Sequence, residues 1–199
     1  MHEHRDLRAT DLRIVDGLPV VVAEFVMLQF AAQRWTTIDK VESLIYEARR
    51  KRLLTLESLD AFLRSKAKRG RPGVRKLRAA LVRARRHEIP PESNPETMLL
   101  QCLRKHGLGE PQLQFVLRDR TGNFVGRFDA ALPDDRILIE YQSMEWHQDE
   151  EAIARANDRR LEAFGLGWFV VEARWWDIKT GGRKLVSAIR NHRSAYRRH

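Results

Sequence analysis

The sequence predicts an α/β protein in which a small all-helical basic segment precedes a mixed α/β domain. Apolar residues recur at helical spacing through most of the first 86 positions. After the stretch HEIPPESNP, helical spacing alternates with short apolar runs typical of strands. Three prolines in that stretch place a domain boundary near Ile89 to Glu92. We therefore expect two domains, residues 1–90 and 91–199.

Composition excludes several classes of protein. The chain has 199 residues, of which 43% are hydrophobic, so it can bury a real core. Its single cysteine, Cys102, rules out a disulfide framework and a cysteine zinc site. No apolar run approaches the ~18 residues of a membrane span. We expect an intracellular, cytoplasmic protein with no membrane partner, and the oligomeric state stays open.

The net charge of +10 is unevenly placed. Positions 49–86 hold 15 lysines and arginines against 2 acids, whereas positions 87–199 are balanced at 17 of each. A block this basic favours a polyanionic partner, and DNA is the expected one. The alternative is a solvated helix face.

The basic segment reads as a series of helices. Residues 1–19 are polar and irregular, with a turn signal at positions 16–19. Helices are expected at about 20–33, at 38–52 after a cap at Thr36 or Thr37, and from Thr55 to about Gly70. A fourth begins after positions 71–73, and its apolar stripe is Val74, Leu77, Leu81 and Ala84. Its opposite face carries the expected DNA contacts Arg75, Arg78 and Arg83.

The second domain has the expected order α-β-β-β-α-β-α. Ser93 and Glu96 form a capping box at the start of a helix that Gly107 closes. Strands are predicted at 112–118, within the hairpin 124–142 and at 168–173, and helices at 150–164 and 184–192. In the helix at 150–164, helical phase predicts four inward apolar residues. They are Ile153, Ala156, Leu161 and Phe164.

The hairpin FVGRFDAALPDDRILIEYQ is the stretch most suggestive of chemistry. Alternation predicts that even positions 124–132 share one face and leave Asp129 on the other. A two-residue turn at positions 134–135 pairs Pro133 with Arg136 and sets Asp129 opposite Glu140, with Gln142 on the same face. The apolar run 137–139 predicts a strand buried on both faces.

Directly opposed carboxylates repel one another unless a cation or proton lies between them. A divalent ion with oxygen ligands resolves that repulsion. The alternative is a surface hairpin with solvated acids.

Several spaced motifs of residues 93–178 resemble the PD-(D/E)XK nucleases, and more closely a domain of unknown function related to the very-short-patch-repair (Vsr) endonuclease. The motifs are Ser93-Asn94-Pro95-Glu96, Gly126-Arg127-Phe128-Asp129, Glu140-Tyr141-Gln142, His147, Asp158-Arg159-Arg160, Gly167-Trp168-Phe169-Val170 and Trp175-Trp176-Asp177. Residues 4–88 resemble the segment that precedes this domain in AbiEi-type antitoxin proteins. The match rests on the Gly-Leu-Pro-Val at 17–20 and the Gly-Arg-Pro-Gly at 70–73. The winged helix that often begins such proteins is not found in this sequence.

The resemblance implies a restriction-endonuclease-like fold and a metal-dependent DNA endonuclease. Asp129 and Glu140 would hold Mg²⁺ or Mn²⁺, and Gln142 would complete the catalytic triplet. Glu96 would hydrogen-bond a metal-bound water or act as a helix cap alone. His147 would serve as general acid or base, or is a surface histidine.

The second domain also carries expected nucleic-acid contacts, and a rival function stays open. Arg127 and Arg160 are the expected phosphate contacts of this domain, and helical phase points Arg160 toward the sheet together with Ile153 and Phe164. Gln142 stands where the superfamily has lysine, and Glu172 where the family commonly has arginine. These departures keep a rival interpretation, a catalytically inactive DNA-binding regulator or antitoxin-like protein that retains the fold.

Overall fold

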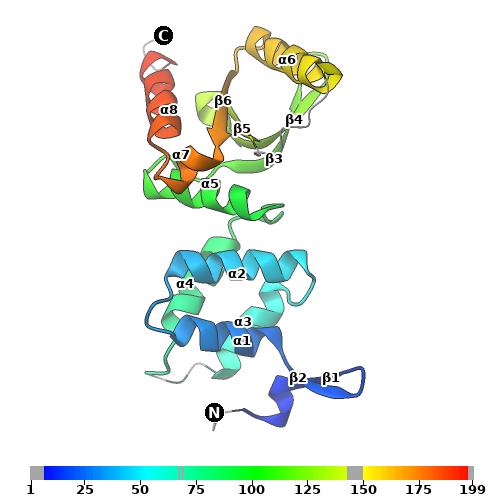
Figure 1. Ribbon diagram of the computed structural model, residues 1–199, viewed down its shortest axis with the longest axis vertical. Helices are drawn as coiled ribbons and strands as arrows, with labels where there is room; N and C mark the ends of the chain where they lie inside the picture. Colours follow the sequence, from blue (N-terminus) through cyan, green and yellow to red (C-terminus); the bar gives the residue numbers. More distant parts are fainter. Residues whose placement is uncertain (1–6, 67, 69, 143–149, 197–199) are drawn as a thin grey trace. The chain divides into compact units, whose positions relative to one another are not determined.

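The computed structural model describes residues 7–66, 68, 70–142 and 150–196. The chain divides into two compact units, Met1–Pro90 and Pro91–His199, and the division falls within the proline-containing stretch. Figure 1 shows helices and a small hairpin in the first unit, and a sheet with helices in the second. The protein is therefore of the mixed α/β class. Among the described residues, no helix is long and apolar enough to cross a membrane.

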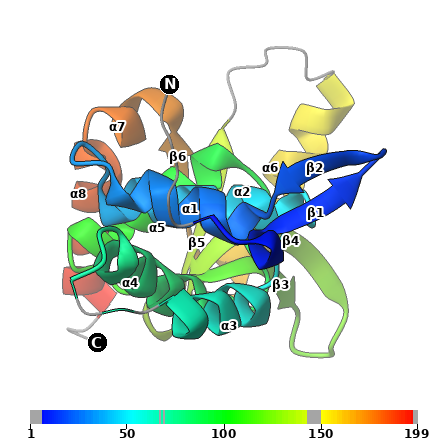
Figure 2. The ribbon, with the colours of Figure 1, turned by 90° about the horizontal axis from the view of Figure 1, so that it is seen from below.

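The first unit begins with a 3-10 turn and a β-hairpin, where the sequence predicted irregular structure. The turn covers Ala9–Asp11, and strands β1 (Leu12–Val15) and β2 (Leu18–Val21) pair antiparallel. The predicted turn is present, because Asp16 and Gly17 both have positive φ, as two-residue hairpin turns require. The strands extend away from the helices in both views (Figures 1 and 2). Apolar residues at 12, 14, 18 and 20 flank the Asp-Gly turn, a hairpin signal that the sequence analysis missed, although most residues of both strands are exposed.

Four helices build the core of the first unit: α1 (Ala23–Ala32), α2 (Ile38–Arg50), α3 (Leu56–Lys66) and α4 (Val74–Ala84). Thr37 caps α2 by accepting a hydrogen bond from the Lys40 N–H, and the predicted apolar stripe of α4 is buried. Gly73, before α4, has φ of 84°, and a Cβ there would lie 2.6 Å from the Leu28 carbonyl oxygen. Glycine therefore allows α4 to approach α1 closely.

The second unit is a four-stranded sheet with helices on both faces. Its elements follow the order α5 (Asn94–Lys105), β3 (Gln112–Arg118), β4 (Phe124–Leu132), β5 (Ile137–Gln142), α6 (Glu150–Gly165), β6 (Phe169–Arg174), α7 (Trp175–Lys179) and α8 (Arg183–Tyr196). The sheet order is β3-β4-β5-β6, with β3, β4 and β5 antiparallel in sequence and β6 parallel to β5. The predicted element order is confirmed except for the short helix α7, which the sequence analysis missed.

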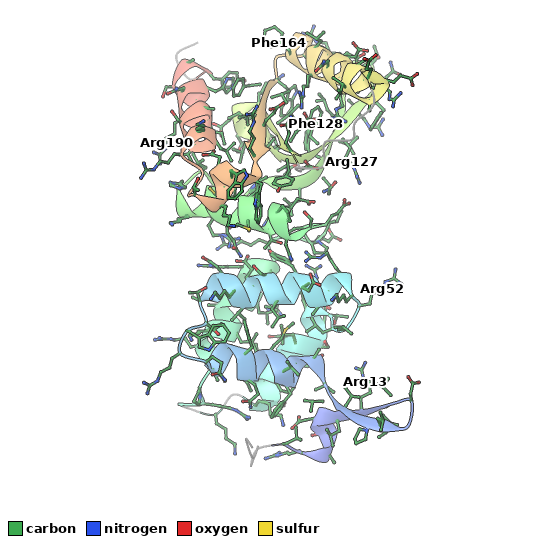
Figure 3. All side chains as sticks on the ribbon, in the orientation of Figure 1. Arg13, Arg52, Arg127, Phe128, Phe164 and Arg190 are labelled. Atoms are coloured by element: carbon green, nitrogen blue, oxygen red, sulfur yellow. The ribbon has the colours of Figure 1, made fainter. Side chains whose placement is uncertain are left out.

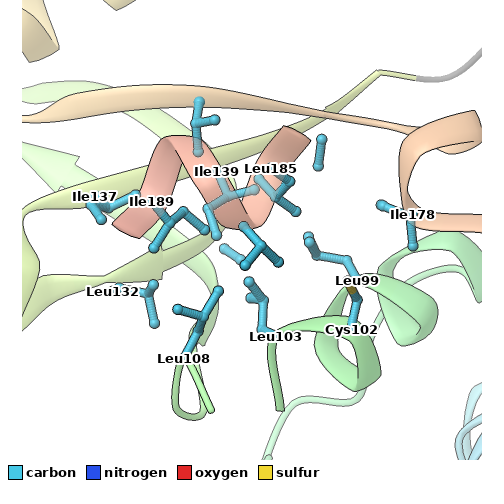
Figure 4. Packing of buried hydrophobic residues seen from close by; sticks show 14 residues of the cluster. Leu99, Cys102, Leu103, Leu108, Leu132, Ile137, Ile139, Ile178, Leu185 and Ile189 are labelled. Atoms are coloured by element: carbon cyan, nitrogen blue, oxygen red, sulfur yellow. The ribbon is translucent and has the colours of Figure 1, made fainter. Parts of the chain in front are cut away.

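Two apolar clusters lie on opposite faces of this sheet. The larger cluster joins α5, α7 and α8 to the sheet and includes Ile137 and Ile139 (Figure 4). The smaller cluster includes Leu138 and Ala163 of α6. The predicted burial of β5 on both faces is therefore confirmed.

The predicted alternation along β4 is wrong at one point. Phe128 packs in the smaller cluster, whereas Ala130 and Leu132 pack in the larger one. Strand β3 changes face at the same level, since Leu113 packs against the larger cluster and Phe115 against the smaller. Between them, Gln114 has a positive φ of 52°, which interrupts the regular pleat.

The orientation predicted for α6 is also wrong. Ile153, Leu161 and Phe164 are exposed, Phe164 to 75%, and Ala163 is the buried residue of the helix. Figure 3 labels Phe164 on the helix and Phe128 within the sheet. Arg159 and Arg160 of α6 instead contact a carboxylate of β5. The helix thus turns Ala163 and the two arginines toward the sheet and leaves Ala156 half-buried, whereas the other three residues of the predicted set are exposed.

Candidate functional site

The candidate site lies where β4 and β5 stop pairing. Ala130 pairs with Ile139, and continuing that register by one residue sets Asp129 opposite Glu140. The connection is a 3-10 turn, Pro133–Asp135, in place of a simple two-residue turn, yet the Arg136 N–H still donates to the Pro133 carbonyl. The predicted register is confirmed for positions 130–132 with 137–139, and Asp129 and Glu140 lie one step beyond the last paired residues.

Asp129 replaces the backbone as a hydrogen-bond acceptor at this point. Its Oδ2 accepts from the Tyr141 N–H at 2.6 Å, so the carboxylate takes the place of a strand partner. Burial raises the pKa of the Asp129 carboxyl, the Tyr141 N–H opposes the rise, and the nearby Glu140 carboxylate adds to it. The two acids are thus close enough to feel each other's charge.

Glu140 is buried and is neutralised by two arginines of α6. Arg159 donates to Oε1, and Arg160 Nε donates to Oε2 at 2.6 Å. Arg160 also contacts Glu172 of the neighbouring strand β6 at 2.9 Å. Glu140 and Glu172 lie side by side in the sheet, so Arg160 bridges two like charges. Arg160 was predicted as a phosphate contact. It lies at the site, but it can bind a phosphate only if it releases Glu140 or Glu172.

Glu96 approaches the site from the start of α5. Ser93 caps the helix as predicted, accepting from the Glu96 N–H, while its own hydroxyl donates to Glu96 Oε1 at 2.9 Å. Glu96 Oε2 accepts from the Glu92 N–H and from Gln114 Nε2. Burial raises the pKa of Glu96, these hydrogen bonds lower it, and the charge of Asp129 raises it further. Glu96 therefore both caps the helix and lies close to the acid pair.

Gln114 is a site residue that sequence reasoning missed. The flanking pairs Leu113–Ala130 and Phe115–Phe128 place it opposite Asp129. Because its Nε2 donates to Glu96, its Oε1 is fixed as an acceptor, and that atom is buried with no hydrogen-bond partner in the part of the chain that the structure describes. A buried unpaired acceptor is costly, of order 1–3 kcal/mol. This oxygen lies beside Glu96 and Asp129, so it is an acceptor suited to a water or a cation.

The two other predicted catalytic residues are Gln142 and His147. Gln142 is the exposed last residue of β5 and pairs with Arg174 across the sheet. His147 lies outside the described residues. Gln142 therefore shares the strand of Glu140 and lies at its exposed end.

The predicted DNA contacts fall into three situations. Arg75 and Arg78 are exposed on α4. Arg83 contacts Asp39 at 2.6 Å and Glu42 at 3.7 Å, so its charge is used within the first unit. Arg127 is exposed on β4 and contacts Glu92 at 3.3 Å. Arg75 and Arg78 are the members of the basic face best placed to meet a phosphate.

The oxygen donors at this site suit a hard divalent cation. Among the described residues, no group of three or more histidine, cysteine or acidic side chains could hold a metal ion. Mg²⁺ is commonly held by one or two carboxylates together with water and substrate phosphates, so Asp129 and Glu140 are a sufficient protein contribution. The unpaired Gln114 oxygen is a further acceptor suited to a metal-bound water. The donor set fits, provided that the arginines release Glu140.

Comparison with known proteins gives relatives without a stated activity. An uncharacterized protein of Mycobacterium tuberculosis, found in strains CDC 1551 / Oshkosh and H37Rv, is 31% identical over 174 residues. The match covers 81% of this chain and 60% of the length of those relatives. No family model and no solved structure matches the chain.

Proposed function

We propose that this protein is a metal-dependent DNA endonuclease whose site is Asp129, Glu140 and Glu96. The observation that carries the proposal is the register that brings Asp129 against Glu140 at the point where β4 and β5 separate. Glu140 is buried, Asp129 is half-buried, and the charge of Glu140 raises the pKa of Asp129. Such a pair of acids, beside the Gln114 oxygen that has no partner among the described residues, is typical of a cation site.

The fold of the second unit supports this proposal. Its order is helix, three antiparallel strands, helix, then a strand parallel to the third. This is the arrangement expected of the PD-(D/E)XK-like restriction-endonuclease fold with a Vsr-like sequence. The site lies on the second and third strands, as that resemblance implies.

The chemistry of the proposed reaction is hydrolysis of a phosphodiester. Asp129 and Glu140 would hold Mg²⁺ or Mn²⁺, and the bound ion would polarise the phosphate and lower the pKa of a water. Glu96, with its raised pKa, would accept a hydrogen bond from a water at the site. The basic face of α4 would supply phosphate contacts that are independent of DNA sequence.

The test is cleavage of supercoiled and linear DNA with Mg²⁺ or Mn²⁺. We expect the wild type to cleave and Asp129→Ala to lose cleavage by at least 100-fold. Asp134→Ala, in the exposed turn of the same hairpin, is the matched control and keeps wild-type activity. Equal cleavage by wild type and Asp129→Ala would remove the proposed site.

A second candidate is a DNA-binding regulator or antitoxin-like protein without catalysis. It is favoured by one observation, the engagement of both Glu140 oxygens by Arg159 and Arg160. In that case the network is a permanent structural element, Glu172 completes it, and DNA binding occurs without metal. Metal-independent DNA binding without any cleavage would favour this candidate.

A further inference from the structure

The Arg159 side chain reaches Glu140 by packing against two residues of β4, Phe128 and Gly126. Its guanidinium lies over the ring of Phe128, with Cζ 5.1 Å from the ring centroid, and then donates to Glu140. The side chain crosses β4 directly over Gly126. A Cβ at Gly126 would overlap Cδ and Cγ of Arg159, so any larger residue there displaces the arginine.

A glycine is therefore needed at position 126 to make room for the Arg159 side chain, and the backbone conformation at 126 does not require it. It does not have the positive φ that makes glycine necessary in turns. Its missing side chain leaves the space that Arg159 fills, and the glycine is buried as a result. The glycine at 126 and the arginine at 159 therefore act together to place a guanidinium on Glu140, although 33 positions separate them in the sequence.

The two arginines on Glu140 are not equivalent. Arg160 is also held by Glu172, so it keeps an acidic partner if Glu140 is taken. Arg159 contacts Glu140, and its Nε is buried with no hydrogen-bond partner among the described residues. Arg159 thus occupies Glu140 while one of its own donors is left unpaired, which makes it the arginine more easily drawn away.

We propose that Arg159 is the resident cation of Glu140, and that a divalent metal binds there only after Arg159 leaves. This inference rests on the proposed function. A guanidinium and a divalent ion compete for the same carboxylate oxygen, and the phosphodiester of the substrate is the anion that attracts the displaced arginine. Metal and DNA consequently favour each other's binding, because each binds better once Arg159 has moved. The metal site is closed until substrate arrives.

The experiment measures Mn²⁺ binding by calorimetry in the absence of DNA. We expect Arg159→Met, which keeps an aliphatic side chain over Phe128, to bind Mn²⁺ at least tenfold more tightly than the wild type. Gly126→Ala, which displaces the same arginine, shifts affinity in the same direction. Arg155→Met is the control, because Arg155 is exposed on the same helix and pairs with Glu151 alone among the described acids. Thermal melts confirm that each variant is folded.

A second arm adds a duplex DNA with a hydrolysis-resistant phosphorothioate backbone. We expect it to raise the Mn²⁺ affinity of the wild type by a factor at least tenfold larger than the factor for Arg159→Met. The variant has no arginine to displace, so it keeps only the coupling that comes from direct contact between the metal and a phosphate.

The outcomes separate this inference from the proposed function. If Mn²⁺ binding depends on Asp129 but is equal in wild type, Arg159→Met and Gly126→Ala, the inference is overturned while the metal site stands. If no variant binds Mn²⁺ in an Asp129-dependent manner, even with DNA, the proposed function and this inference both fall.

Discussion

At the scale of single residues, the charge on Glu140 is balanced within the protein itself. The sequence alone predicted two opposed carboxylates that repel one another. In the structure, Arg159 and Arg160 neutralise one of them. Removing the charge of Glu140 has two opposite effects on stability. It relieves the repulsion with Asp129, but it also leaves two partly buried guanidinium groups without their shared carboxylate, which is destabilising.

We expect Glu140→Gln to lower the free energy of unfolding of the metal-free protein by about 1–2 kcal/mol, because the arginines are partly exposed and solvent shares their charge. Urea unfolding with EDTA present measures it. The control Glu151→Gln removes an exposed acid of α6 and changes stability by less than about 0.5 kcal/mol. A Glu140→Gln variant more stable than wild type would show that repulsion from Asp129 dominates.

At the scale of single elements, helix α4 divides its basic residues between structure and surface. Arg83 is engaged by Asp39 and Glu42, whereas Arg75 and Arg78 are exposed on the face opposite the buried stripe. Of the three arginines of α4 predicted to contact a polyanion, only Arg75 and Arg78 are therefore exposed for that contact. Reversing Arg83 would instead place two acids of α2 beside a new acid.

Reversing Arg75 and Arg78 to Glu is expected to weaken DNA binding and to flatten its dependence on salt. Each lost phosphate contact reduces the log–log slope by about 0.9 for duplex DNA. Binding titrations at several salt concentrations measure it. The double variant Arg13→Glu with Arg155→Glu has the same net charge, and both of its sites are exposed and lie outside α4. Equal slopes for the two double variants would show that α4 is a solvated face.

At the scale of the whole molecule, the second unit encloses its own core. Both apolar clusters described for the sheet consist of residues between positions 98 and 189. The first unit has its own buried stripes on α1 to α4. Each unit therefore has the burial needed to fold as a cooperative body.

We expect a fragment of residues 91–199 to unfold in one cooperative thermal transition. In that fragment and in the full chain alike, Ile139→Ala should destabilise the second unit by about 2–5 kcal/mol, since Ile139 is fully buried. Val116→Ala, at an exposed position of β3, should have little effect. A fragment with no cooperative transition would show that the sheet depends on the first unit.

The sequence by itself determined local structure and register. The capping box at Ser93, the stripe of α4 and the two-sided burial of positions 137–139 follow from patterns shorter than 20 residues, and so does the alignment of Asp129 with Glu140. Such features depend on neighbours along the chain, where the spacing of side chains is fixed by helix or strand geometry.

Only the tertiary structure decided which surfaces meet. Periodicity shows that Ile153, Leu161 and Phe164 share a side of α6, but it does not show which side the sheet covers. In the structure, Ala163 and the two arginines that pair with Glu140 face the sheet, and that stripe is exposed. The unpaired oxygen of Gln114 and the space at Gly126 likewise arise where separate strands and helices come together. The physical reason is that burial and charge pairing depend on partners distant in the sequence, which no local pattern records.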